Sequence, residues 1–279
     1  MNRVVFVFLM MITLGYAKVD AVVSILPQVS FVKAIGGDKV NIALMVEPGN
    51  SPHSYEPKPS QMKEISKAKL YFAIGVEFEN VWLERFKAQN SSMKVIDTTV
   101  NVTKLAMKKH EGYDHHDTKE GLDPHIWTAP NNLKIVAQNI YEAFKSSDQA
   151  NEAYYKANFD KFIAHIDQVD QEIKTILKDT PKGAKFMVFH PAWGYFAKQY
   201  GLIQLPIEVE GKEPKPKTVA KLINKAKQEK IRAIFTAPEF SDTTAKTIAD
   251  ELGISVIKVS PLNPKWGENL INLAKAIAN

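Results

Sequence analysis

Short apolar runs alternate with amphipathic segments along most of the chain. The runs are rich in Val, Ile and Phe and predict buried strands, whereas segments with apolar residues three or four positions apart predict helices. The predicted strands are residues 21–26, 40–46, 70–75, 94–99, 184–190, 203–207, 231–237 and 254–259. The predicted helices are residues 27–37, 59–69, 78–89, 130–148, 151–179, 194–201, 216–230, 241–253 and 266–279. This alternation is typical of parallel sheets with helices on both faces.

The alternation is interrupted between residues 130 and 179, where only helical periodicity remains. The second helix there, of about 29 residues, would be about 43 Å long and could connect two domains. The sequence therefore predicts an α/β fold with two (β/α)4-type lobes of parallel sheets, joined by one long rigid helix. The expected bounds are 18–150, 151–180 and 181–279. Ligands of open α/β sheets bind beyond the carboxyl ends of the strands, so a site is expected at the lobe interface.

The first 17 residues have the three regions of a secretory signal peptide. Arg3 precedes an apolar run over residues 4–14, and small residues at 15 and 17 predict cleavage after Ala17. A buried first strand or a retained anchor is the alternative. The chain has no cysteine, which excludes disulfides, thiolate zinc sites and an acylated N-terminal cysteine. We expect a soluble exported protein, in a Gram-negative periplasm.

The chain carries 36 Lys and Arg against 31 Asp and Glu, a formal net charge of +5. Its densest group of lysines falls in the predicted helix 216–230, where Val219, Leu222, Ile223 and Ala226 share one face. The lysines then lie mostly on the opposite face, which favours a solvated surface over a binding site for nucleic acid or acidic membranes. We expect a monomer that binds no nucleic acid and does not insert into a membrane.

Three histidines, His53, His125 and His190, lie in loops or at the end of a predicted strand. Each has a proline as a direct neighbour, and proline restricts the backbone around it, which would hold a ligand in place before an ion arrives. Three neutral imidazoles suit Zn2+, with a weaker preference for copper or nickel and a poor match to Ca2+ or Mg2+. Any one of them is as often an ordinary loop residue, so the joint placement is what predicts a metal site.

Five motifs, spread over nearly the whole chain, together resemble those of a known family. They are PHSYEPKPS (52–60), DPHIWTAP (123–130), FHPAWGYFAKQYGL (189–202), APEFSDTTAKTIADELG (237–253) and SPLNP (260–264). Through them the chain resembles the periplasmic metal-binding component of zinc and manganese ABC importers, the cluster A-I family, and most closely its ZnuA-type zinc members.

The resemblance implies that His53, His125 and His190 are the metal ligands and that an inner-membrane ABC permease is the partner. It also implies that the long helix is a stiff hinge and that the protein is not an enzyme. Manganese-type members of the family carry a glutamate where His190 stands, so the histidine favours Zn2+ over manganese or another divalent metal.

The fourth ligand departs from the pattern of the family. Many relatives have aspartate at the position of Ser260, and some zinc members have glutamate at the position of Pro52. A serine hydroxyl is a weak zinc ligand. We expect water to complete the site, or a more distant carboxylate from Glu239, Glu208 or Glu210.

Residues 110–120 hold three further histidines and four acidic residues. In zinc-type members such a segment lies between the first two ligand histidines. It would act as a low-affinity collector of zinc, or it is a solvated loop that binds zinc incidentally. His165 lies among acidic residues on the long helix, where a solvated helix face is favoured.

Three other classes of protein fit the sequence less well. A zinc hydrolase also uses three protein ligands and an open position, but the chain has no H-E-x-x-H or G-x-S-x-G motif. A binding protein for an iron chelate or corrinoid would need aromatic and cationic groups around a wide pocket. An adhesin role occurs in some lineages of the family, and nothing in this sequence argues for it.

Overall fold

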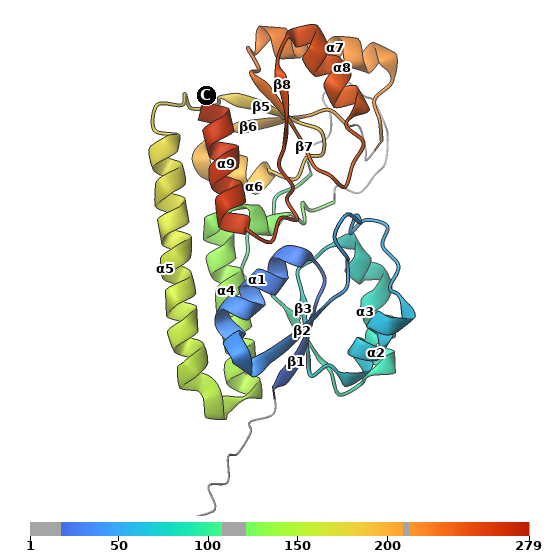
Figure 1. Cartoon of the computed structure of the whole chain (residues 1–279), viewed down its shortest axis with the longest axis vertical. Coiled ribbons are helices and arrows are strands. Elements are labelled where there is room, and N and C mark those ends of the chain that lie inside the picture. The colour runs from blue at the N-terminus through green and yellow to red at the C-terminus, as the bar shows by residue number, and fades with distance from the viewer. Residues whose placement is uncertain (1–17, 108–120, 209–211, 279) are drawn as a thin grey trace, which may run out of the picture.

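Two parallel four-stranded sheets form the two lobes of the computed structural model, which describes residues 18–107, 121–208 and 212–278 (Figure 1). The first sheet has the order β2-β1-β3-β4, with β1 (Val19–Val23), β2 (Val40–Leu44), β3 (Leu70–Ala73) and β4 (Lys94–Asp97). The second has the order β6-β5-β7-β8, with β5 (Lys185–Val188), β6 (Ile203–Pro206), β7 (Ala233–Thr236) and β8 (Ser255–Lys258). The predicted fold class is confirmed.

Helices connect the successive strands of each sheet. They are α1 (Leu26–Gly36), α2 (Pro59–Lys67), α3 (Glu77–Gln89), α6 (Gly194–Tyr200), α7 (Pro216–Gln228) and α8 (Thr243–Leu252). A proline lies in the first turn of α1, α2 and α7, where its missing N–H would have no partner within the helix. Gly201 and Gly253 end α6 and α8 in the left-handed conformation, as their positive φ angles require.

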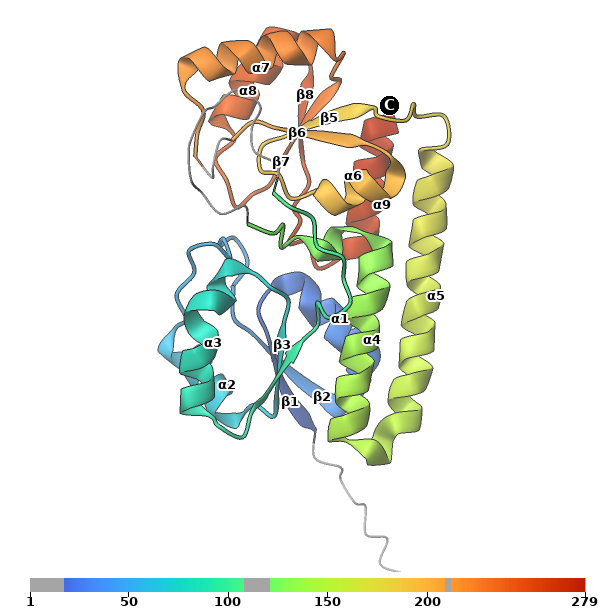
Figure 2. The ribbon, with the colours of Figure 1, turned by 180° about the vertical axis from the view of Figure 1, so that it is seen from behind.

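Three more helices lie along one flank of the molecule, as both views of the ribbon show (Figures 1 and 2). They are α4 (Pro130–Ser147), α5 (Glu152–Ile176) and α9 (Trp266–Ala278). Helix α5 runs past both lobes, as the long joining helix was predicted to do. It has 25 residues and ends at Ile176, so the last predicted turn is not helical.

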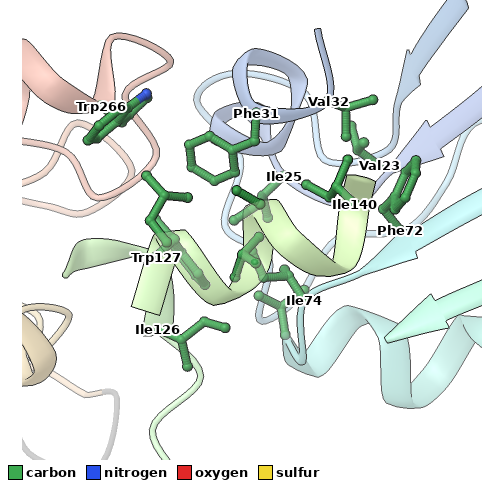
Figure 3. Packing of buried hydrophobic residues seen from close by; sticks show 14 of the residues in the cluster. Val23, Ile25, Phe31, Val32, Phe72, Ile74, Ile126, Trp127, Ile140 and Trp266 are labelled. Carbon is green, nitrogen blue, oxygen red and sulfur yellow. The ribbon is translucent and has the colours of Figure 1, made fainter. Parts of the chain in front are cut away.

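The larger hydrophobic core joins the first sheet to this layer of helices. Phe31 of α1 lies 6.2 Å from Phe162 of α5 and 6.3 Å from Trp266 of α9, measured between ring centroids. Figure 3 shows Phe31 and Trp266 facing each other across this core. The last helix follows the second sheet in sequence and runs beside the second lobe, but its first residue, Trp266, contacts the first lobe (Figure 1). The bounds predicted for the two lobes stay a prediction.

A smaller core, which includes Met187, Ile234 and Ile248, lies within the second lobe. Hydrogen bonds also join segments that are far apart in the chain. Trp127 Nε1 donates to the Pro261 carbonyl at 2.8 Å, and Ser30 Oγ donates to the Pro264 carbonyl at 2.7 Å. The first bond fixes the segment after β8 against the segment that carries His125, and the second fixes it against α1.

The predicted signal peptide, residues 1–17, and the histidine-rich segment 110–120 lie outside the described residues. Within the three described ranges, none of the helices combines the length and the apolar character that crossing a bilayer requires.

Candidate metal centre

His53, His125 and His190 come together between the two lobes. His53 lies in the loop between β2 and α2, His125 just before the 3-10 turn Ile126–Thr128, and His190 just after β5. One ring nitrogen from each lies within 4.8 Å of the others. The ring centroid of His190 is 5.1 Å from that of His53 and 5.2 Å from that of His125. The structure thus gathers all three histidines that the sequence singles out.

Each histidine is held by its local backbone or by a neighbouring ring. The Phe78 N–H in the first turn of α3 donates to the Pro52 carbonyl at 3.1 Å, which ties the His53 loop to that helix. The Thr128 hydroxyl donates to the His125 carbonyl at 2.9 Å. The ring of Phe240 stacks on the ring of His190, with centroids 4.5 Å apart.

A carboxylate contacts Nδ1 of each histidine. The distances are 3.0 Å from Glu77 Oε2 to His53, 2.8 Å from Asp123 Oδ1 to His125 and 2.8 Å from Glu208 Oε1 to His190. An ionised carboxylate can only accept, so we assign the proton to Nδ1 in the rings of His125 and His190, whose contacts are hydrogen bonds. Nε2 is then left with a lone pair. Carboxylates paired with histidines in this way fix the orientation of ligand rings around a metal.

The spacing of the Nε2 atoms favours a cation at the centre of the cluster. His125 Nε2 lies 3.3 Å from His190 Nε2. With Nδ1 protonated in both rings, two lone pairs face each other at this distance, and only a metal ion or a proton between them makes the arrangement favourable. Three neutral imidazoles with one open position form a donor set that fits Zn2+. That these residues bind metal is a prediction.

Burial and the neighbouring carboxylates change the proton affinities of the histidines. The hydrogen bond to Glu77 raises the pKa of His53, with burial opposing it. Burial lowers the pKa of His190, with the Glu208 hydrogen bond opposing it. Burial alone would raise the pKa of Glu77, but the contact with His53, a backbone hydrogen bond and the charge of His125 together outweigh it, and the pKa lies below the ordinary value. His53 is also the more exposed histidine of these two, with 30% of its side chain accessible against 10% for His190.

No carboxylate of the described ranges joins the three histidine nitrogens as a fourth member of the cluster. Glu208 lies on Nδ1 of His190, behind the ring. Ser260 Oγ donates to Glu239 Oε1 at 2.8 Å, and both residues line a cavity of about 350 Å3 together with Glu47 and Leu262. Glu210 lies outside the described residues.

The sequence interpretation missed the carboxylates on Nδ1. Asp123 stands two positions before His125, within a motif that was quoted without a role for it. Glu77 is the first residue of a helix, where an acidic side chain is ordinarily explained by the helix dipole. Glu208 was considered only as a metal ligand. His165 lies on α5 beside Trp266, outside the cluster, as expected.

Two parallel α/β lobes on a long helix, with a cluster of histidines between them, define a solute-binding protein with a site suited to a metal ion. The model of the family described as "Zinc-uptake complex component A periplasmic" (ZnuA) matches residues 21–279. The chain belongs to this family. It is a family of solute-binding proteins and not of enzymes, as the sequence predicts.

Two of the similar known proteins are named ZnuA, and a third is named a zinc-binding protein. The chain superposes on a crystal structure of ZnuA with a TM-score of 0.86 and 40% identity, covering 94% of this chain and 98% of that one. It is 30% identical over 244 residues to the high-affinity zinc uptake system protein ZnuA of Bacillus subtilis, covering 85% of this chain and 76% of that protein. It is 29% identical over 266 residues to the zinc-binding protein AdcA of Streptococcus pyogenes, covering 89% of this chain and 51% of AdcA. The chain therefore spans about half the length of AdcA.

Proposed function

We propose that this protein captures Zn2+ in the periplasm through His53, His125 and His190 and delivers it to an inner-membrane ABC permease. The observation that carries the proposal is the convergence of the three rings, each with a carboxylate on Nδ1. The relatives named for zinc uptake and zinc binding support the same role. The binding of manganese or another divalent metal is the alternative.

The donor set favours Zn2+ over the alternative ions. Imidazole nitrogen suits zinc, whereas manganese prefers carboxylate, carbonyl and water oxygens. Here the three carboxylates nearest the histidines lie on Nδ1 atoms and not in the cluster. Two observations disfavour a zinc hydrolase. The family is one of solute-binding proteins, and no described carboxylate joins the cluster where it could act as a general base.

Titration of the purified, metal-free protein with Zn2+ in competition with a chelator tests this proposal. We expect one tightly bound Zn2+ per chain and much weaker binding of Mn2+. Hydrolysis of ester or peptide substrates by the zinc-loaded protein should be at background. Manganese affinity equal to or above that for zinc would overturn the assignment of the ion.

The same titration repeated across pH should show a stepped loss of affinity. A ligand nitrogen must be free of its proton to bind metal. Because the pKa of His53 lies above 6.5 and that of His190 below it, the loss begins above pH 6.5 with His53 and steepens below pH 6.5. We expect about a tenfold loss per pH unit for each proton that zinc must displace. Affinity that stays constant down to about pH 6 would contradict a histidine site.

Ser260 and Glu239 are expected to be dispensable for zinc affinity. Both lie outside the histidine cluster, and Ser260 Oγ is engaged with Glu239 Oε1. The variants Ser260→Ala and Glu239→Ala should therefore bind Zn2+ within about threefold of the parent protein, a difference of under about 1 kcal/mol. A loss well above about a hundredfold in either variant would show that it supplies the fourth ligand, because residues outside the ligand set cost about a hundredfold at most.

A further inference from the structure

The hydroxyl of Tyr195 connects the second lobe to the segment that carries His125. Tyr195 lies on α6, the helix that follows His190, and is 4% exposed. Its hydroxyl donates to the Asp123 carbonyl at 2.7 Å and accepts from the Leu105 N–H at 3.0 Å. This one oxygen atom therefore holds two segments of the first lobe, at Leu105 and at Asp123, against a helix of the second lobe.

The two residues that Tyr195 holds are bonded to each other, and Asp123 is also bonded to His125. The Asp123 N–H donates to the Leu105 carbonyl at 2.8 Å. The Asp123 carboxylate accepts from the backbone N–H of His125 at 2.9 Å and contacts its Nδ1 at 2.8 Å. A short chain of hydrogen bonds thus runs from Tyr195 through Asp123 to the ring of His125.

Gly194 provides the second contact between α6 and Asp123. A Cβ atom on Gly194 would lie 2.8 Å from Asp123 Oδ2, closer than Cβ atoms pack, and 3.2 Å from Gln204 Nε2, which is a tight contact. The absence of a side chain therefore lets the backbone of α6 approach the Asp123 carboxylate. Gly194 makes room for this carboxylate while Tyr195 holds its backbone carbonyl.

We propose that Tyr195 is a positioning residue that fixes His125 against His190 across the boundary between the lobes. The inference rests on the proposed function. His190 precedes α6 in the chain and Tyr195 is part of α6, so one short segment sets the positions of two ligands from opposite lobes. The 3.3 Å separation of the two Nε2 atoms is maintained before the metal arrives. Ligands held in place in this way bind more tightly, since less freedom is lost on binding.

Replacing Tyr195 by phenylalanine removes only the oxygen atom. The Leu105 N–H and the Asp123 carbonyl then lose this partner, and Asp123 can shift together with His125. Zinc affinity should fall about tenfold, the lower end of the range for residues that orient metal ligands. The d–d spectrum of bound Co2+, used as a probe of ligand geometry, should change as well.

Tyr200→Phe is the matched control. Tyr200 is also on α6, and its hydroxyl donates to Asp170 Oδ1 of α5 at 2.8 Å, away from the histidines. Both variants lose a partly buried tyrosine hydroxyl, so both should lower the melting temperature of the metal-free protein. Only Tyr195→Phe should weaken zinc binding and alter the Co2+ spectrum. Equal zinc affinity and equal Co2+ spectra in the two variants would overturn the inference.

Gly194→Ala tests the same connection from the other side of Asp123. Its added methyl group should displace the carboxylate and lower zinc affinity about as much as Tyr195→Phe, with the hydroxyl still present. Unchanged zinc affinity in Gly194→Ala would also count against the inference. A parent protein that binds no Zn2+ would instead refute the proposed function, so the two failures are distinguishable.

Discussion

Replacing His190 by alanine is expected to weaken Zn2+ binding by about 100- to 1000-fold. Four-ligand zinc sites in small domains bind with about 10–16 kcal/mol, so each ligand contributes about 3 kcal/mol, and about 1.4 kcal/mol corresponds to a factor of ten. His190 is almost fully buried and faces His125 at 3.3 Å, so nothing in the cluster can replace its nitrogen. Competition with a chelator of known affinity measures the loss.

His165→Ala is the matched control for this variant. His165 is the one described histidine of the long helix α5, and it contacts Trp266 rather than the cluster. Its replacement should leave the affinity within about twofold, under about 0.5 kcal/mol. If His190→Ala kept the parent affinity while its melting temperature showed a folded protein, the assignment of the metal site would be wrong.

The order of strands and helices could be predicted because periodicity is local. Seven of the eight predicted strands contain the observed strand, which ends one or two residues earlier. The exception is β1, which begins two residues before its predicted start and ends three residues before its predicted end. The predicted strand 184–190, for example, ends at Val188, because the chain turns before the His190–Pro191 pair. The order of strands within each sheet and the packing of α9 could not be predicted. Trp266 contacts Phe31 through the tertiary fold, and no local pattern records that pairing.

The histidines of the site could be predicted, whereas the residues that hold them could not. His53, His125 and His190 are scarce residues in loops beside prolines, and carboxyl ends of parallel strands meet at one edge of a sheet. Glu77, by contrast, is one of many acidic residues, and its role follows only from the 3.0 Å contact with His53. In the sequence, Tyr195 looks like any buried aromatic residue of a helix. Its role could not be predicted because its hydrogen bonds to Leu105 and Asp123 cross the boundary between the lobes.

Under the proposed function, the three carboxylates keep the buried or half-buried imidazoles ready to bind metal. A histidine ring without a fixed partner can rotate or exchange its proton between Nδ1 and Nε2, and one of its tautomers cannot bind metal through Nε2. Asp123 and Glu208 are themselves buried, at 6% and 4% exposure, so water does not compete for their hydrogen bonds. The ring orientations at His125 and His190 therefore depend on these two side chains.

Asp123→Ala is accordingly expected to lower zinc affinity by about 10- to 100-fold, the range found when partners of metal-binding histidines are removed. The change deletes the acceptor for Nδ1 and for the backbone N–H of His125, but leaves the three imidazoles in the chain. Asp242→Ala is the matched control. The Asp242 carboxylate binds Lys246 and Lys258 at the surface, so its loss should not change zinc affinity.

A double variant can decide whether Tyr195 acts through Asp123. Tyr195 holds the backbone of Asp123, and the side chain of Asp123 holds His125, so the two belong to one path to the ligand. Once the carboxylate is gone, the Tyr195 hydroxyl has little left to position at the ring. Asp123→Ala combined with Tyr195→Phe should therefore bind zinc about as weakly as Asp123→Ala alone, because coupled residues are not additive. Fully additive losses would show that Tyr195 reaches the site by another route.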